Sequence, residues 1–322
     1  MKISVIGCGR WGTFIAWYLS DLHDVKLWGR VGSCHMKTLM ETRKNEYLTL
    51  KDNIKLTTDL DEAMESDVII ISVLAQEFKN VMQELKKKNV KDKIVVLCMK
   101  GIESETGKRL SEIAIENDVD KQKLAVWVGP GHVQNFIQGI PNCMIIVSSN
   151  MDLTKKLVSA FSTKLIRFYI GNDIIGAEIG AATKNILGIA AGMLDGMNMA
   201  CLKGALMARG TREVARLIKV LGGNVLTPYG LSHLGDFEAT LFSKLSQNRM
   251  WGEKFVTHEE SQKSAEGVGN ILGILVLANK YKVEMPITEM LYQVIFKGLD
   301  LKIAFEKMFL RGIKEEFGSQ DE

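Results

Sequence analysis

One lysine stands in a segment where small residues recur at a four-residue spacing. Glycine occupies positions 176, 180, 188, 192 and 196, and Lys184 fills the missing place in that series. A glycine in a helix interior costs about 1 kcal/mol relative to alanine, so the repetition indicates a helix face that another element approaches closely. A lysine held there, partly away from water, loses proton affinity and can act as an acid or a base. Lys184 is therefore the candidate catalytic group.

Two other interpretations of this segment compete with the catalytic one. Small residues four apart also occur in packed membrane-spanning helices. However, Glu178, Lys184 and Asp195 lie inside the stretch, and a central lysine costs about 2.5–3.5 kcal/mol on insertion. We therefore expect no integral membrane span. A buried structural helix whose lysine reaches solvent stays open as the second alternative.

A glycine-rich run at the beginning of the sequence predicts a nucleotide site. Gly7, Gly9 and Gly12 form a G-x-G-x-x-G pattern that also contains Arg10 and Trp11. The run ends an apolar strand and opens a helix, where glycines let the backbone approach a pyrophosphate at the helix N-terminus. This context predicts binding of NAD or NADP; a tight turn without a ligand is the alternative.

The residue after the second predicted strand bears on the choice between the two cofactors. NAD-selective sites usually carry an acidic residue there, which accepts hydrogen bonds from the ribose. This chain has Arg30 in that region, and a guanidinium can pair with a 2′-phosphate or stack on adenine. Arg30 therefore favours NADP or the use of both cofactors, unless it is only a solvated surface arginine.

The elements that must position these groups follow two different patterns. Short apolar runs predict strands at residues 3–6, 25–28, 68–73, 94–98, 124–128 and 144–147, and helices are expected at 11–20, 76–87, 107–117 and 153–162. Strands that are apolar throughout and alternate with helices indicate a parallel sheet covered on both faces. The fold class predicted for this half is an α/β, Rossmann-like doubly wound sheet.

The rest of the chain has helical periodicity only. Helices are expected at residues 173–199, 203–221, 257–281, 287–296 and 301–309. We therefore predict a dinucleotide-binding domain over residues 1–172 and an all-α substrate-binding domain over residues 173–322. The substrate should lie between them, at the carboxyl ends of the strands.

Composition narrows the class of protein. The 322 residues are 46% hydrophobic and 25% charged, as is ordinary for a soluble protein. A net charge of +3 is too small to indicate nucleic acid but suits an anionic small substrate. Five scattered cysteines, and histidines at 132, 233 and 258, lack metal-ligand spacing, so no metal is expected. Reduced thiols and the lack of a cleavable signal predict a cytoplasmic protein.

With these residues placed, the chain resembles the NAD(P)-dependent glycerol-3-phosphate dehydrogenases of the bacterial type. The matching stretches are residues 7–16, 100–103, 129–130, 178–196, 209–210, 230–236, 248 and 284–287. The resemblance implies that the protein interconverts dihydroxyacetone phosphate and sn-glycerol 3-phosphate. The substrate would thus be a phosphorylated small molecule, and the glycerol 3-phosphate would supply phospholipid synthesis. Members of the family often form dimers, which makes a homodimer one possible assembly.

The resemblance also assigns roles to individual residues. Lys184 matches the catalytic lysine, while Lys100 and Asp236 match the groups that orient substrate and hold that lysine. The matching substrate-binding residues are Lys100, Gly129, Gly131, Lys184, Asn185, Asp236, Thr240, Ser246, Gln247 and Asn248. The matching cofactor-binding residues are Gly7, Gly9, Arg10, Trp11, Gly12, Arg30, Lys100, Val133, Gln247 and Glu266.

The sequence departs from the family pattern at two places. Gln247 stands where the family has an arginine that pairs with the substrate phosphate, and Arg249 could compensate only if the helix turns it toward the site. Gly131 lacks the usual polar side chain, and Val133 replaces an alanine. These changes keep two alternatives open: a dehydrogenase of the same fold with a different hydroxy or keto substrate, and a non-catalytic nucleotide-binding sensor.

Overall fold

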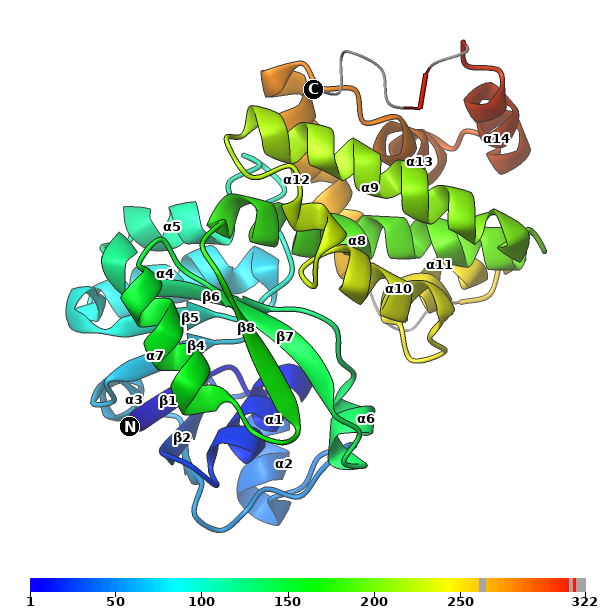
Figure 1. Ribbon diagram of the computed structural model, residues 1–322. Coiled ribbons are helices and arrows are strands. Elements are labelled where there is room, and N and C mark those ends of the chain that lie inside the picture. Colours follow the sequence, from blue (N-terminus) through cyan, green and yellow to red (C-terminus); the bar gives the residue numbers. More distant parts are fainter. Residues whose placement is uncertain (261–264, 313–314, 317–322) are drawn as a thin grey trace.

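The computed structural model describes residues 1–260, 265–312 and 315–316. Figure 1 shows a twisted sheet with helices on both faces, formed by the first half of the chain, and a group of helices formed by the second half. The long helix α8 (Ile174–Gly196) runs from the sheet into that group. The predicted fold class, a Rossmann-like sheet followed by a helical part, is confirmed. The division at residues 172 and 173 stays a prediction.

Eight strands form the sheet, in the order β3-β2-β1-β4-β5-β6-β7-β8. They are β1 (Lys2–Ile6), β2 (Asp24–Trp28), β3 (Lys55–Thr57), β4 (Val68–Ile71), β5 (Ile94–Leu97), β6 (Leu124–Val128), β7 (Asn142–Val147) and β8 (Ile166–Gly171). Every residue of β4 and β6 is buried, as expected for central strands covered on both faces. The carboxyl ends of β1, β2, β4, β5 and β6 therefore meet at one edge.

The prediction of a wholly parallel sheet is wrong at one position. β7 runs antiparallel to β6, because the segment between them holds only the five-residue helix α6 (Val133–Ile137) and turns back without crossing the sheet. Two strands were also missing from the prediction. β3 has only three residues, and the edge strand β8 alternates buried and exposed side chains at its start, so neither forms a continuous apolar run.

The remaining helices of the sheet half are α1 (Arg10–Leu19), α2 (Cys34–Thr42), α3 (Leu60–Met64), α4 (Phe78–Lys86), α5 (Leu110–Glu116) and α7 (Met151–Phe161). Short 3-10 helices lie at η1 (Ala75–Glu77), η2 (Val90–Asp92), η3 (Lys121–Lys123), η4 (Ala200–Leu202) and η5 (Thr227–Tyr229). The helical half contains α9 (Lys203–Val220), α10 (Leu234–Phe242), α11 (Gln247–Thr257), α12 (Glu266–Tyr281), α13 (Pro286–Lys297) and α14 (Leu301–Phe309).

The predicted helix over residues 257–281 is wrong at its beginning. α11 ends at Thr257, since His258 takes the left-handed conformation at φ 58° and its backbone N–H bonds to the Lys254 carbonyl. α12 begins at Glu266, and residues 261–264 of the predicted helix lie outside the described residues. Helices α10 and α11 were not predicted at all, although they supply part of the site.

The glycines of α8 are where neighbouring helices touch its backbone. A Cβ added at Gly192 would lie 1.9 Å from the carbonyl oxygen of Arg249 on α11, and one at Gly188 would lie 2.8 Å from the Thr240 side chain on α10. α11 contributes its own glycine, because a Cβ on Gly252 would lie 2.1 Å from the Ile189 carbonyl. The predicted close-approach face therefore exists, and it seats α10 and α11.

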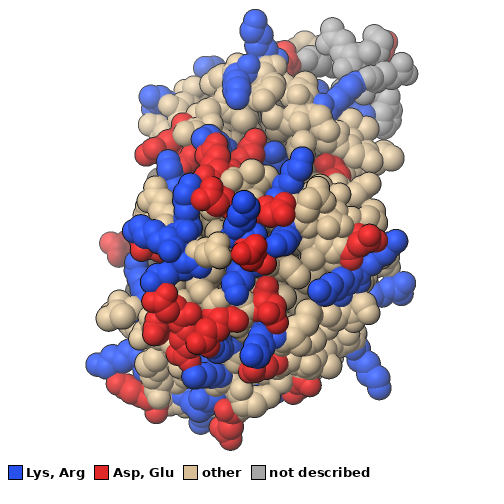
Figure 2. Space-filling model, turned by 90° about the vertical axis from the view of Figure 1, so that its left-hand side faces the viewer, with Lys and Arg blue, Asp and Glu red and all other residues tan. Residues whose placement is uncertain are grey.

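α8 is also long and apolar enough to cross a membrane by length and composition, but 89% of its apolar window is buried inside the fold. It is the core helix of the molecule. A buried carboxylate on it, Glu178, accepts hydrogen bonds from the Ser111 backbone (2.8 Å) and hydroxyl (2.5 Å) at the start of α5 and from the Arg109 guanidinium (3.0 Å). This contact ties the helical half to the sheet half. On the face shown in Figure 2, acidic and basic side chains are interspersed.

Candidate active site

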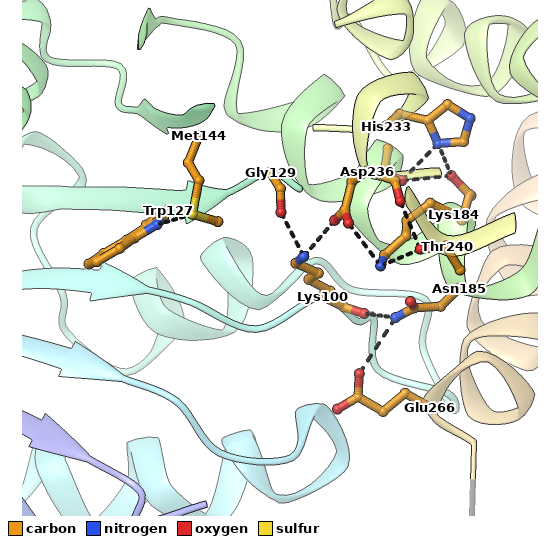
Figure 3. Close-up of polar contacts among 12 residues, drawn as sticks. Lys100, Trp127, Gly129, Met144, Lys184, Asn185, His233, Asp236, Thr240 and Glu266 are labelled. Atoms are coloured by element: carbon orange, nitrogen blue, oxygen red, sulfur yellow. Dashed lines mark hydrogen bonds and ion pairs between the residues drawn. The ribbon is translucent and has the colours of Figure 1, made fainter. Parts of the chain in front are cut away.

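Two lysines and one aspartate from distant parts of the chain meet beside the sheet edge (Figure 3). Lys100 follows β5, Lys184 lies in the middle of α8, and Asp236 lies in the first turn of α10. One oxygen of Asp236 accepts a hydrogen bond from the Lys184 ammonium at 3.2 Å and the other accepts one from Lys100 at 2.5 Å. The Thr240 hydroxyl accepts a second bond from Lys184 at 3.1 Å, and the Gly129 carbonyl accepts one from Lys100 at 2.8 Å.

Burial sets the proton affinities of this cluster. It lowers the pKa of Lys184 to about 8; the nearby Asp236 opposes this shift, whereas the Lys100 charge reinforces it. Burial by itself would raise the pKa of Asp236, but the two ammonium groups outweigh it and hold that pKa below its ordinary value. Asp236 is therefore a carboxylate at neutral pH, and Lys184 is mainly an ammonium that lies close enough to its pKa to release its proton. A buried amine with this pKa can both donate and accept a proton.

A second layer of amides holds the cluster in place. Asn185 donates to the Lys100 carbonyl at 3.0 Å and to Glu266 at 3.5 Å. Asn270, four residues after Glu266 on α12, donates to the same Lys100 carbonyl at 3.2 Å and to the Ala182 carbonyl at 3.1 Å. The sequence analysis missed Asn270. The signal was its four-residue spacing from Glu266, which places both side chains on one face of the helix.

The beginning of α11 carries three residues that were expected to bind the substrate, Ser246, Gln247 and Asn248. Ser246 is the N-cap and accepts from the Arg249 backbone N–H at 3.3 Å, while Asn248 accepts from the Gly267 N–H at 3.0 Å. Gln247 is half-buried, and its side chain makes no hydrogen bond to the described residues. The Arg249 guanidinium is bound to Asp195 (2.6 Å) and to Glu253 (3.0 Å). Arg249 therefore does not supply the positive charge that Gln247 lacks.

The loop after β6 brings a histidine close to the cluster. Gly131 adopts φ +157°, and a Cβ there would lie 2.4 Å from the Phe136 ring, so no larger residue fits without movement. Burial, followed by the charge of Lys184, lowers the pKa of His132. The histidine was expected only on the surface or in the core. Val133 is buried at the first position of α6.

The glycine turn after β1 fits a dinucleotide. A Cβ at Gly7 would lie 2.1 Å from the Ser72 carbonyl oxygen and one at Gly12 would lie 1.9 Å from the Gly7 carbonyl oxygen, so these two glycines close the turn. A Cβ at Gly9 would meet nothing within 4 Å, which leaves open space beside the N-cap of α1. No side chain caps the first turn of α1, and its backbone N–H groups can therefore bind an anion such as a pyrophosphate.

The other residues expected to bind the cofactor differ in their solvent exposure. Arg10 stacks over the Tyr47 ring at 5.6 Å, and Trp11 packs on Phe14 with ring centroids 5.1 Å apart. Arg30 is exposed after β2. Glu266, the first residue of α12, keeps an exposed surface; partial loss of hydration raises its pKa against the opposing charges of Lys184, Lys100 and Arg10. Among the described residues no group of three or more His, Cys, Asp or Glu side chains could hold a metal ion.

The site combines a dinucleotide-binding turn on a doubly wound sheet with a buried amine of lowered pKa. These two features are typical of a dehydrogenase that uses a nicotinamide cofactor. The comparisons with known proteins narrow this class. Residues 2–154 match the family model described as NAD-dependent glycerol-3-phosphate dehydrogenase N-terminus, and residues 173–306 match the model for its C-terminus. The chain belongs to the family of NAD-dependent glycerol-3-phosphate dehydrogenases.

Individual relatives agree with the family models. A glycerol-3-phosphate dehydrogenase [NAD(P)+] of Thermoanaerobacter sp. (strain X514) is 36% identical, covering 98% of this chain and 99% of the relative. One from Prosthecochloris aestuarii is 34% identical, covering 98% and 100%. A crystal structure of glycerol-3-phosphate dehydrogenase from Coxiella burnetii superimposes with a TM-score of 0.90 at 27% identity, covering 96% of this chain and 99% of that one.

These findings confirm several predictions made from the sequence. The family resemblance, the class of NAD(P)-dependent oxidoreductases acting on a CH–OH group, and NAD or NADP as the cofactor are all confirmed. Full-length similarity to dehydrogenases gives no support to the alternatives of a different substrate or a non-catalytic sensor. The roles of the individual site residues stay predictions.

Proposed function

We propose that this protein interconverts dihydroxyacetone phosphate and sn-glycerol 3-phosphate with NAD or NADP, and that Lys184 is the general acid and base. The observation that carries the proposal is the Lys184 ammonium, buried between Asp236 and Thr240 with a pKa of about 8. When bound, the nicotinamide cofactor supplies the hydride for ketone reduction and accepts it in the reverse direction.

The protein's own groups handle the proton. In the reducing direction the Lys184 ammonium donates a proton to the oxygen that was the ketone oxygen, and in the oxidising direction the neutral amine removes it. Asp236 binds both Lys184 and Lys100, so the two ammonium groups are held side by side despite their repulsion. Lys100 adds a second positive charge that stabilises negative charge on the same substrate oxygen.

The substrate-binding residues surround these two lysines. Asn185 and Thr240 contribute polar atoms beside Lys184, and the backbone of Gly129 and Gly131 lines the opposite side, after β6. We assign the phosphate end to the beginning of α11, where the substrate would meet Ser246, Gln247 and Asn248. Backbone N–H groups in the first turn of a helix attract an anion, which partly offsets the missing family arginine.

The proposed cofactor-binding residues lie along the same edge of the sheet, from the glycine turn to the lysine cluster. Gly7, Gly9, Arg10, Trp11 and Gly12 would hold the pyrophosphate, and the exposed Arg30 would lie at the adenosine ribose. Lys100, Val133, Gln247 and Glu266 would face the nicotinamide end. The guanidinium of Arg30 supports use of NADP alongside NAD.

The setting of the enzyme follows from the proposed reaction. A phosphorylated small molecule is consistent with the family, and we infer that phospholipid synthesis consumes the product. We also propose a cytoplasmic location and a homodimer as the assembly.

An initial-rate assay with dihydroxyacetone phosphate, run in parallel with NADH and NADPH, tests the function. We expect both reductants to be oxidised, and we expect Lys184→Ala to lower kcat by about 10²- to 10⁴-fold, the usual contribution of a positioned acid or base. Cofactor binding, followed by nicotinamide fluorescence, should be retained in Lys184→Ala. Absence of turnover in the wild-type protein, or equal turnover of the unphosphorylated ketone dihydroxyacetone, would contradict the proposal.

A further inference from the structure

The helical half contains an apolar cavity that the dehydrogenase reaction does not use. It has a volume of about 240 Å³ and lies between α8, α9, α13 and α14. The wall on α8 includes Met193 and Met197. The lining residue of α8 nearest to Lys184 is Ala190, six residues further on, which is about 9 Å along the helix axis and about 120° around it. The cavity is therefore separate from the candidate active site.

The lining is apolar with a single exception. Aliphatic, methionine and phenylalanine side chains form the walls, and Phe305 and Phe309 of α14 contribute two rings with centroids 5.4 Å apart. The exception is Arg209 of α9, which is exposed. Its guanidinium makes no hydrogen bond or ion pair to the other residues that the structure describes. Arg209 belongs to a stretch that carries the family resemblance, yet the proposed function assigns it no role.

The size and chemistry of the cavity indicate what it can hold. An apolar cavity of about 150 Å³ stays free of water and binds benzene, so a cavity of this volume has room for about ten carbon atoms. Apolar walls favour a hydrocarbon chain, since each buried methylene adds to affinity and no polar group is left without a partner. A free guanidinium at the exposed side favours an anionic head group, above all a phosphate or carboxylate.

We propose that this cavity, called here the acyl pocket, binds the alkyl chain of a single-chain anionic amphiphile whose phosphate or carboxylate head pairs with Arg209. The ligand class is an alkyl or acyl chain of about eight to ten carbons inside the protein, with any longer remainder outside. Binding at this pocket does not depend on the assigned active-site roles, so the proposed function and the acyl pocket can fail separately.

Calorimetric titration of the full-length protein with hexyl, octyl, decyl and dodecyl phosphate, each below its micelle concentration, tests the pocket. Binding should be one to one, and each added pair of methylenes should tighten it about fifteenfold up to the decyl chain. Dodecyl phosphate should gain little more. Decanoate should bind in the same way if the pocket accepts carboxylates, whereas decyltrimethylammonium should bind more weakly than either anion.

Three variants locate the binding. Ala205→Trp, on the α9 wall, should abolish it by filling the cavity. Arg209→Gln should lower the affinity for the anionic amphiphiles about threefold to fivefold, as expected for the loss of an exposed ion pair. The affinity for decyltrimethylammonium should stay unchanged. Lys219→Gln removes an exposed charge from the same helix away from the pocket and should have no effect.

Several results would overturn the acyl pocket. These are an absence of saturable binding, affinities that keep rising beyond the decyl chain, or equal binding of the cationic amphiphile. A dimer that Ala205→Trp converts to monomers, with no amphiphile bound by the wild type, would show that a second copy covers the cavity. The chain-length series uses only the wild-type protein, so the test stands even if Ala205→Trp fails to fold.

Discussion

Lys184 and Lys100 lie against the same carboxylate, and this arrangement gives the two lysines different surroundings. The Lys184 side chain lies between α8 and α10 and is 10% exposed, whereas the Lys100 side chain keeps 18% of its surface exposed. Burial lowers the pKa of Lys184, and Asp236 limits that shift by favouring the ammonium form. One carboxylate thus keeps the buried lysine protonated often enough to act as an acid near neutral pH.

The pH dependence of the reaction should report this balance. Reduction needs the Lys184 ammonium, so kcat/KM for dihydroxyacetone phosphate should fall as the pH rises above about 8. Oxidation of glycerol 3-phosphate needs the neutral amine and should rise over the same range. Asp236→Asn removes the charge that favours the ammonium, and it should move the falling limb to lower pH. Identical limbs in the wild type and Asp236→Asn would show that another group titrates.

Gln247 stands where the resemblance to the family predicts an arginine. Gln247→Arg should restore a charged contact with the substrate phosphate and lower KM for dihydroxyacetone phosphate about tenfold or more, since a charged hydrogen bond contributes about 1.5–3 kcal/mol. The effect should leave kcat nearly unchanged because the phosphate does not react. Gln247→Met, similar in length but without a hydrogen-bonding group, is the control and should raise KM. An unchanged KM in Gln247→Arg would place the phosphate elsewhere.

At the scale of elements, α8 organises the helical half. Its residues from Gly176 to Leu194 are all buried, and its glycines let α10 and α11 approach at backbone distance. The face that seats α10 also carries Lys184, so the close approach brings Asp236 and Thr240 within hydrogen-bond distance of the amine. The close packing and the candidate catalytic amine therefore share one face of one helix.

A pair of glycine substitutions tests that packing. Gly192→Ala should lower the free energy of unfolding by about 1–3 kcal/mol, because the new Cβ would lie 1.9 Å from the Arg249 carbonyl oxygen. Gly204→Ala in the first turn of α9 is the control, since its Cβ would meet nothing within 4 Å. It should raise the free energy of unfolding by about 0.4–1 kcal/mol. Urea denaturation measures both, and equal effects would mean that the close approach is not formed.

At the scale of the whole molecule, the candidate site combines the edge of the sheet with four helices of the other half, α8, α10, α11 and α12. The contact between Glu178 on α8 and Arg109 beside α5 helps to hold the two halves together. Its side chains are only 5% and 16% exposed, respectively, so water screens their interaction weakly. The Ser111 backbone and hydroxyl complete the coordination of this carboxylate.

A double-mutant cycle should measure this link between the halves. Glu178→Gln and Arg109→Gln should each lower the free energy of unfolding, and their combined effect should be smaller than the sum by about 0.5–3 kcal/mol. Urea denaturation followed by circular dichroism gives the four values. Lys108→Gln is the neighbouring control, because its ammonium pairs with the exposed Glu116 instead. If the effects of Glu178→Gln and Arg109→Gln on the free energy of unfolding were strictly additive, the two side chains would not be energetically coupled.

Local patterns in the sequence were enough to predict six of the eight strands, the dinucleotide turn and the catalytic candidate. Strand periodicity, the spacing of Gly7, Gly9 and Gly12, and the glycine series around Lys184 each lie within a short segment, where backbone sterics and hydrophobic burial act directly. The beginning of α12 and the antiparallel strand β7 were predicted wrongly, since both depend on how the chain turns between elements.

Only the tertiary structure decided which side chains meet. Asn270 reaches the Lys100 carbonyl across 170 positions of sequence, and Arg249 turns away from the site to bind Asp195. No local sequence pattern predicts these contacts, because they result from the packing of whole helices against α8 and the sheet. The sequence therefore determined the class of the protein and its candidate catalytic amine, and the packing determined the pKa of that amine and its partners.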